Sequence, residues 1–299
     1  MNYNKFCAIL NKYIFEGEKK ELLRKLADSP ERFVGLFRPT KPGAKILQYL
    51  LQSHEIRFGN AMEELISEFL KKWGFRVLPK AIIPNSLKPR EKLTIDHYFT
   101  DGKIYYFIEQ KVRDDHDSTK KRGQIRNFEA KLEFLYKKHE QNLVGKQNLV
   151  GIMYFIDPDL VKNKNYYMEE LDKMVDIYGI DLYLFYGKEL FEFFKKGRDW
   201  DNLLSWLTRW KESLPELPEI NFDSNPQNSF NEIKDLEIRF WRKILENEKL
   251  WKEGIMLAIF RNGKTLKMLY EFFSKRSERA YQKLAEMIRQ KLRDYYESS

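Results

Sequence analysis

Two carboxylates and a lysine lie close together in one short stretch of the sequence. Twelve residues separate Asp96 from Glu109, and Lys111 follows Glu109 at two positions. Side chains two positions apart on a strand point to the same face, so Glu109 and Lys111 should share a face. Carboxylate oxygens suit Mg²⁺, and a neighbouring ammonium can stabilise negative charge on a reacting phosphate. The stretch therefore predicts metal-assisted hydrolysis of a phosphodiester, with the Gln110 carbonyl as a further metal ligand.

The residues around this constellation predict a β-hairpin that brings Asp96 towards the other two. Residues 93–99 alternate in a β-like way, an Asp-Gly turn signal follows, and residues 104–112 are rich in β-formers. Three charged residues on a hairpin are often only a solvated surface, and this alternative stays open. The run Ile-Tyr-Tyr-Phe-Ile over 104–108 is typical of a buried strand, however, and it leads directly into Glu109. This placement favours a site.

The elements on either side alternate between helices and strands. The predicted helices are 55–74, 124–143, 166–178 and 188–196, and the predicted further strands are 75–78, 149–156 and 180–186. The charged residues 114–123 predict a loop. This order predicts an α/β fold in which a central mixed β-sheet is flanked by helices.

Four regions can be separated along the chain. Residues 1–54 predict a helical N-terminal region, and residues 55–212 contain the constellation and form the predicted catalytic core. Residues 213–230 are rich in Pro, Asn and Ser and predict a linker, and residues 231–299 predict a helical C-terminal region.

Composition favours a nucleic-acid partner without requiring one. The formal net charge of +9 suits a polyanion, although many basic proteins bind no nucleic acid. The single cysteine, Cys7, cannot form an internal disulfide and fits a reducing compartment. No apolar run is long enough to span a membrane, and the first residues do not resemble a signal peptide. We therefore expect a cytoplasmic protein.

The constellation in its hairpin resembles the signature of the PD-(D/E)XK nuclease superfamily, with Ile95 in place of the nominal proline. Two flanking segments are similar to those of type II restriction endonucleases: the helix containing Gly59–Glu63, and the late strand and helix over 180–191. The resemblance covers about residues 55–195. It implies a restriction-endonuclease-like core, a Mg²⁺ cofactor, and hydrolysis of double-stranded DNA at a specific sequence to leave 5′-phosphate ends.

The upstream helix offers two adjacent acids, and helical spacing separates them. Glu63 falls on the inward face with Met62 and Ile66, whereas Glu64 falls on the wet face. The restriction-endonuclease resemblance implies an extra acidic residue on this helix, so Glu63 is the fourth predicted catalytic residue. The alternative is that Glu63 is an ordinary acid on a helix surface.

The polar segment after the constellation predicts contacts with DNA. The candidates for phosphate or base contacts are Arg113, Lys120, Lys121, Arg122, Gln124, Arg126 and Asn127. Asp114, Asp115 and Asp117 are candidates for supporting acids around the metal. Residues 261–293 contain ten Lys or Arg and three Asp or Glu, which could bind the DNA backbone, pack a dimer, or simply be solvated.

The expected assembly follows from the expected reaction. Symmetric cutting of two strands is simplest with two copies of one active site, so we expect a homodimer. A restriction enzyme also implies a cognate DNA methyltransferase in the same system. Two other functions remain open: a DNA repair or structure-selective nuclease of the same superfamily, and a DNA-binding protein that does not cut.

Overall fold

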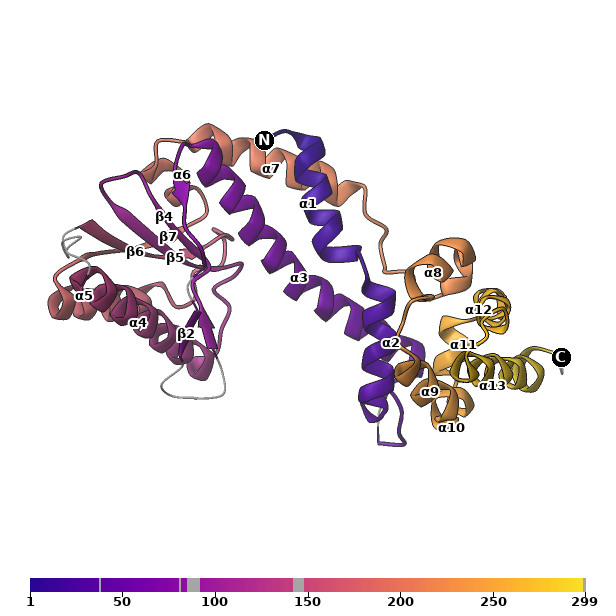
Figure 1. The fold of residues 1–299 in the computed structure, drawn as a ribbon. Coiled ribbons are helices and arrows are strands. Elements are labelled where there is room, and N and C mark those ends of the chain that lie inside the picture. Colours follow the sequence, from indigo (N-terminus) through magenta and orange to yellow (C-terminus); the bar gives the residue numbers. More distant parts are fainter. Residues whose placement is uncertain (38, 81, 85–91, 142–147, 298–299) are drawn as a thin grey trace. The chain divides into compact units, whose positions relative to one another are not determined.

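The computed structural model describes the chain except for residues 38, 81, 85–91, 142–147 and 298–299 (Figure 1). The chain divides into two compact units, each built from two segments. Unit 1 comprises Met1–Leu10 and Phe58–Leu214, and unit 2 comprises Asn11–Arg57 and Pro215–Ser299. The boundaries between the segments fall inside α1 (Tyr3–Phe15), inside α3 (Pro42–Lys72), and after Leu214.

Unit 1 is built around a mixed five-stranded sheet. Its strands, in spatial order, are β1 (Arg76–Val77), β4 (His97–Thr100), β5 (Tyr105–Lys111), β6 (Leu149–Phe155) and β7 (Asp181–Tyr186). β1, β4 and β5 pair antiparallel, whereas β5, β6 and β7 pair parallel. A separate two-stranded sheet joins β2 (Ile82–Pro84) and β3 (Lys92–Thr94). The predicted α/β class with a central mixed sheet is confirmed.

The turn between β4 and β5 fixes the register of the hairpin. The Asp101 carboxylate accepts hydrogen bonds from the backbone N–H groups of Lys103 and Ile104, each at 2.8 Å. Gly102 takes a positive φ of +98°, which its missing Cβ allows. The resulting register pairs His97 with Ile108. Asp96, just before β4, is thereby brought to the end of β5 that carries Glu109.

Helices cover both faces of this sheet. α4 (Ser118–Gln141) and α5 (Lys164–Tyr178) lie on one face, where Phe107 and Met153 from the strands join Phe128, Leu132 and Leu171 from the helices in one buried cluster (Figure 1). On the other face, aromatic rings from the end of α3, from β4 and β5, and from α6 (Lys188–Phe193) pack edge to face. α7 (Gly197–Glu212) follows.

Unit 2 is helical and joins the two ends of the sequence. Its N-terminal part contains α2 (Glu18–Asp28) and the short η1 (Pro30–Arg32). Its C-terminal part contains η3 (Phe222–Ser224), α8 (Pro226–Ile233), α9 (Ile238–Glu246), α10 (Glu248–Lys252), α11 (Ile255–Ile259), α12 (Lys264–Ser274) and α13 (Arg279–Tyr296). Leu22 and Leu26 of α2 share a fully buried core with Trp241 of α9. The Arg24 guanidinium also donates to the Glu237 carboxylate at 2.9 Å.

The expected linker is shorter than the sequence suggests. Residues 213–230 contain η3 and most of α8, because Asn221 and Asn225 act as N-caps and Pro226 occupies the first turn. Asn221, Asn225 and Pro226, which resemble linker residues, are therefore helix-start signals. Residues 1–54 likewise do not form a region of their own, because residues 11–57 share a core with the C-terminal helices.

Two predicted boundaries inside unit 1 also differ. The segment 93–99 is not one strand, because Ile95 and Asp96 separate β3 from β4. The predicted loop 114–123 ends earlier, because α4 begins at Ser118 instead of residue 124. Asp117 starts this helix by accepting hydrogen bonds from the N–H groups of Thr119 and Lys120. At its other end α4 is described to Gln141, so residues 142 and 143 of the predicted helix lie outside the described residues.

Candidate active site

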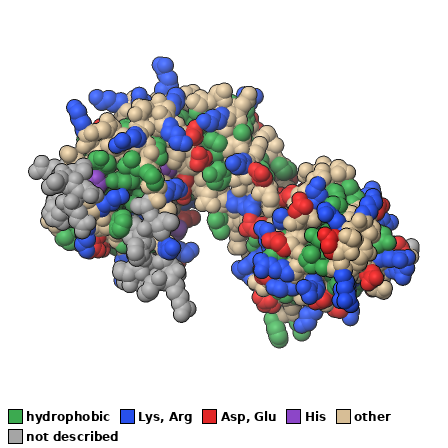
Figure 2. Space-filling view, in the orientation of Figure 1, with side chains coloured by type: hydrophobic (Ala, Val, Ile, Leu, Met, Phe, Trp, Pro, Cys, Tyr) green, Lys and Arg blue, Asp and Glu red, His purple; other side chains and the backbone are tan. Residues whose placement is uncertain are grey.

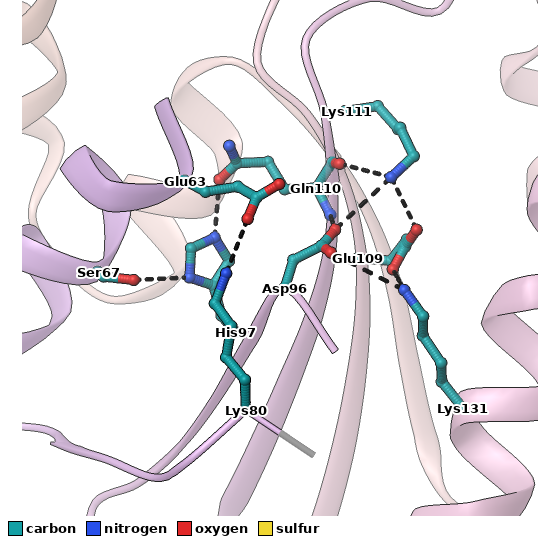
Figure 3. A network of polar contacts seen from close by, with 9 residues as sticks. All are labelled: Glu63, Ser67, Lys80, Asp96, His97, Glu109, Gln110, Lys111 and Lys131. Atoms are coloured by element: carbon teal, nitrogen blue, oxygen red, sulfur yellow. Dashed lines mark hydrogen bonds and ion pairs between the residues drawn. The ribbon is translucent and has the colours of Figure 1, made fainter. Parts of the chain in front are cut away.

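Asp96, Glu109 and Lys111 meet at the end of β5 (Figure 3). Asp96 comes from the break between β3 and β4, where its Oδ2 accepts the backbone N–H of Gln110 at 2.9 Å. Glu109 lies near the end of β5 and is only 3% exposed, and Lys111 ends the strand. The strand periodicity thus places Glu109 and Lys111 on one face, as expected.

Three oxygen atoms surround the ammonium of Lys111. Its Nζ donates to Glu109 Oε1 at 2.7 Å and to the backbone carbonyl of Gln110 at 2.8 Å, and it lies 3.6 Å from Asp96 Oδ2. The oxygens come from the three residues that the sequence proposes as metal ligands. They therefore already define a position that attracts positive charge.

The electrostatic surroundings keep Lys111 protonated. Burial lowers the pKa of its ammonium, but the charges of Glu109 and Asp96, the hydrogen bond to Glu109 and the charge of Glu63 outweigh it. The net effect raises the pKa of Lys111 above its ordinary value. The shift favours the charged form of Lys111 in this arrangement, and a charged ammonium is suited to stabilising negative charge.

A second lysine, which the sequence did not single out, completes the cluster. Lys131 of α4 forms an ion pair with Glu109 Oε2, and its Nζ lies 3.9 Å from Asp96 Oδ1. Its side chain is 5% exposed. One signal was available in the sequence: Lys131 occurs three residues after Phe128 and four before Leu135, on the apolar face of an amphipathic helix.

The side chain of Gln110 points away from the carboxylates and is anchored on the opposite face. Its Oε1 lies 2.9 Å from His97 Nε2, and Ser67 Oγ of α3 lies 3.2 Å from His97 Nδ1. Burial lowers the pKa of His97 to about 4, against a smaller opposing effect of the Gln110 hydrogen bond. His97 is therefore neutral near pH 7 and helps to fix the residue whose carbonyl faces Lys111.

Glu63 approaches this cluster from α3 but pairs elsewhere. Met62 and Ile66 are fully buried, as expected, but Glu63 and Glu64 are both half-buried, so burial does not separate the two acids. The Glu63 carboxylate is half-buried and forms an ion pair with Lys80 at 2.9 Å (Figure 3). It lies close enough to Lys111 to raise the pKa of that lysine.

The predicted DNA-contact residues divide by exposure. Arg113, Lys120, Arg122 and Arg126 are exposed, whereas Lys121, Gln124 and Asn127 are half-buried. Arg113 Nε lies 3.7 Å from Asp157 Oδ2, and Arg122 donates to the Ser118 carbonyl at the start of α4. Two of the half-buried residues contact tyrosines of α5. The Lys121 ammonium lies 4.4 Å from the centre of the Tyr166 ring, and Gln124 accepts a hydrogen bond from the Tyr167 hydroxyl.

The three aspartates proposed as supporting acids have other contacts. Asp114 is fully buried and accepts hydrogen bonds from Asn163 and from the Tyr186 hydroxyl. Asp115 is exposed and lies 3.7 Å from His116, and Asp117 caps α4. In the structure, Asp114 ties the β5–α4 connection to the segment before α5 and to β7.

The ligand chemistry of the cluster suits a hard cation. Within the described residues, no three His, Cys, Asp or Glu side chains come together as a metal site. What the cluster offers is two carboxylates and one carbonyl, and Mg²⁺ is commonly held by one or two carboxylates with other ligands from water and phosphate.

Across the part of the chain that the structure describes, no helix is both long and apolar enough to cross a membrane.

Comparison with known proteins finds one family. A family model described as type II restriction endonuclease, HinfI, matches residues 2–86 and 75–211. These segments include all four residues of the cluster, and residues 212–299 lie outside them. Neither a search of curated proteins nor a search of solved structures finds a match.

Proposed function

Because the chain belongs to the HinfI family of type II restriction endonucleases, we propose that it cuts double-stranded DNA at a specific sequence by Mg²⁺-assisted hydrolysis. One observation carries this proposal. In a chain of this family, Asp96, Glu109 and the Gln110 carbonyl surround the ammonium of Lys111 at the end of a buried strand. The spacing of these residues on a hairpin also supports assignment to the PD-(D/E)XK superfamily.

Asp96, Glu109 and the Gln110 carbonyl are the proposed metal ligands. The fit rests on their oxygens, which contact one ammonium in this structure and would offer the same negative charge to Mg²⁺. When bound, Mg²⁺ would supply positive charge beside the scissile phosphate and lower the pKa of a coordinated water.

Lys111 is the proposed electrostatic stabiliser of the reacting phosphate. Its side chain is 31% exposed, the largest exposure among the four charged residues of the cluster. A lysine stem is flexible, so the ammonium can turn from the carboxylates towards a phosphate while it keeps its charge. The ammonium would then stabilise the negative charge that develops on the phosphate.

The first turns of α4 are proposed to contact DNA. Lys120, Arg122 and Arg126 expose their charges on the helix that also carries Lys131, and Arg113 lies on the connection that leads from β5 to this helix. Cations at these positions would contact backbone phosphates. Gln124 and Asn127 are the proposed base-edge contacts, because amide side chains can bond to base edges in the major groove.

Unit 2 is a second candidate for contact with DNA or with another copy of the chain. Every Lys and Arg within 261–293 is exposed except Lys291. Figure 2 shows many Lys and Arg side chains interspersed with acidic ones on the visible face of unit 2. The mixture is compatible with phosphate contacts and with a dimer interface, and the salt dependence of binding distinguishes them.

Three further properties are proposed from the resemblance to restriction enzymes. Hydrolysis would leave 5′-phosphate ends, and a homodimer would place one site on each strand of a palindromic sequence. A cognate DNA methyltransferase would protect the same sequence from cleavage. These proposals also imply that the enzyme works in the cytoplasm, where both proteins meet DNA.

Digestion of phage DNA tests the proposed activity against its two alternatives. Incubation with Mg²⁺ should give discrete fragments, and the Lys111→Ala variant should give none. A smear would indicate a less selective repair or structure-selective nuclease. Intact DNA that is nevertheless bound by the protein would indicate a binding protein that does not cut. Sequencing the fragment ends would then identify the recognition sequence, the cut position and the end chemistry.

A further inference from the structure

The carboxylates of Asp96 and Glu109 are bridged twice, by two different lysines. Lys111 bridges Glu109 Oε1 and Asp96 Oδ2, at 2.7 and 3.6 Å. Lys131 bridges the other two oxygens: it contacts Glu109 Oε2 and lies 3.9 Å from Asp96 Oδ1. The pair of carboxylates therefore has two cationic positions, and in Figure 3 the two ammoniums approach Glu109 from different elements.

The two positions differ in how easily the lysine ammonium can leave them. The outer position, at Lys111, includes the Gln110 carbonyl, and its lysine side chain is 31% exposed. The inner position, at Lys131, belongs to a side chain that is 5% exposed and rises from α4 between the fully buried Phe128 and Leu135. Removing the inner ammonium would leave the buried Glu109 carboxylate with one counter-charge fewer, which is unfavourable.

We propose that Lys131 permanently takes the place of a second divalent cation, so that each chain binds one divalent ion, at the outer position. This inference rests on the proposed Mg²⁺-assisted reaction. In two-metal sites a second ion helps to neutralise the shared carboxylates and the phosphate. Lys131 already supplies positive charge at that point. A second ion would have to displace this buried ammonium from Glu109.

The number of bound ions tests this inference without any measurement of cleavage. The full chain is titrated with Mn²⁺ in the absence of DNA, and free Mn²⁺ is followed by electron paramagnetic resonance. The wild type should bind one ion per chain, and Asp96→Asn should lose it. Lys131→Ala should bind two, because the vacated space exposes one oxygen of each carboxylate to a hydrated ion.

A matched control separates this role from the general loss of a buried lysine. Lys291 of unit 2 is also buried and pairs with Glu248. Lys291→Ala should still bind one Mn²⁺. If Lys131→Ala is unfolded without metal, as judged by circular dichroism, Mn²⁺ should restore its folding with two ions bound. Failure of Mn²⁺ to restore it would overturn the inference.

The remaining outcomes distinguish this inference from the proposed function. Two ions in the wild type, both lost in Asp96→Asn, would overturn the role of Lys131 and leave metal-assisted cleavage intact. A single ion in folded Lys131→Ala would do the same. No site-bound ion in the wild type would overturn the metal site itself, and with it both proposals.

Discussion

Asp96 Oδ2 accepts the backbone N–H of Gln110 at 2.9 Å, so a carboxylate outside the strands closes the end of the β4–β5 hairpin. The bond engages the main chain of the residue that lies between Glu109 and Lys111. It therefore fixes Asp96 relative to both residues without using their side chains. The arrangement of the cluster depends on the backbone of β5 as much as on attraction between charges.

Glu109→Gln should separate cutting from DNA binding. The substitution keeps the shape but removes a charged metal ligand, so cleavage should fall by about 100- to 1,000-fold and Mn²⁺ affinity should fall with it. DNA binding measured in Ca²⁺ should persist. Because the change also leaves Lys131 without its full counter-charge, the folded state is checked by circular dichroism. Cleavage near the wild-type rate by the folded variant would contradict the proposed metal site.

Lys111→Ala should also abolish cleavage but should differ in metal binding. Cleavage should be lost, because the ammonium proposed to stabilise the reacting phosphate is gone. Metal binding should be kept, because the ion no longer has to compete with an ammonium for the oxygens of Glu109, Asp96 and Gln110. Calorimetric titration with Mn²⁺ provides the measurement, with Lys137→Ala as a control on an exposed lysine of α4 that pairs with Glu133 in an i,i+4 salt bridge. A folded Lys111→Ala enzyme that still cuts efficiently would refute the role given to this lysine.

The two adjacent glutamates of α3 should respond differently. Glu63→Ala should reduce cleavage substantially, since Glu63 lies in the electrostatic surroundings of Lys111. Glu64→Ala should be nearly silent. Single-turnover cleavage rates compare the variants, and the reverse pattern would show that α3 presents the other acid to the reaction. Lys80→Ala, which removes the partner of Glu63, indicates whether that ion pair matters in itself.

Stability should fall as the solution is acidified from about pH 6.5 towards pH 4, in part because of His97. Burial depresses the pKa of His97 to about 4 in the folded chain, whereas an unfolded histidine titrates near 6.5. Between these values the unfolded chain binds a proton that the folded chain does not, so acid favours unfolding by up to about 3 kcal/mol. Urea unfolding at pH 7 and pH 5 measures the effect. His97→Gln should show a shallower dependence, and an unchanged one would argue against this origin.

Neutralising Lys264, Lys267, Lys275 and Arg276 together should weaken binding to all duplexes alike if unit 2 grips phosphates. All four side chains are exposed. The slope of log affinity against log salt should become shallower by up to about 0.9 per lost phosphate contact. An unchanged slope would point to assembly instead. Light scattering of the same variant, free and on DNA, would then show whether the expected homodimer has been lost.

The sequence could predict the sheet because its strands are strongly marked. Residues 104–112 and 149–156 are dense in β-formers, and both become buried strands, β5 and β6. The start of α4 was missed because Lys120, Lys121 and Arg122 oppose the helix dipole at an N-terminus, which makes the segment resemble a loop. Asp117 compensates by capping the helix, an effect visible only once its contacts are known.

The carboxylates and Lys111 could be predicted because they are close in sequence, whereas Lys131 could not be found in this way. Twenty-one residues separate it from Glu109, and its place on the apolar face of the helix does not show which side chains it meets. Only the packing of α4 on the sheet brings it inward. The shared core of unit 2 was missed for a similar reason, because periodicity shows that α2 is amphipathic without showing which helices cover it.

Unit 2 is built from two segments that are far apart in the sequence, and this affects the order in which its parts are made and packed. The bond between Arg24 and Glu237 joins residues 213 positions apart. A ribosome that adds about 5–20 residues per second needs on the order of 10–40 s to cover that distance. The leucines of α2 remain without the native partners supplied by α9 throughout that interval. The burial of α2 is thus completed only long after the helix is made, and the nascent chain must keep its apolar face from aggregating until then.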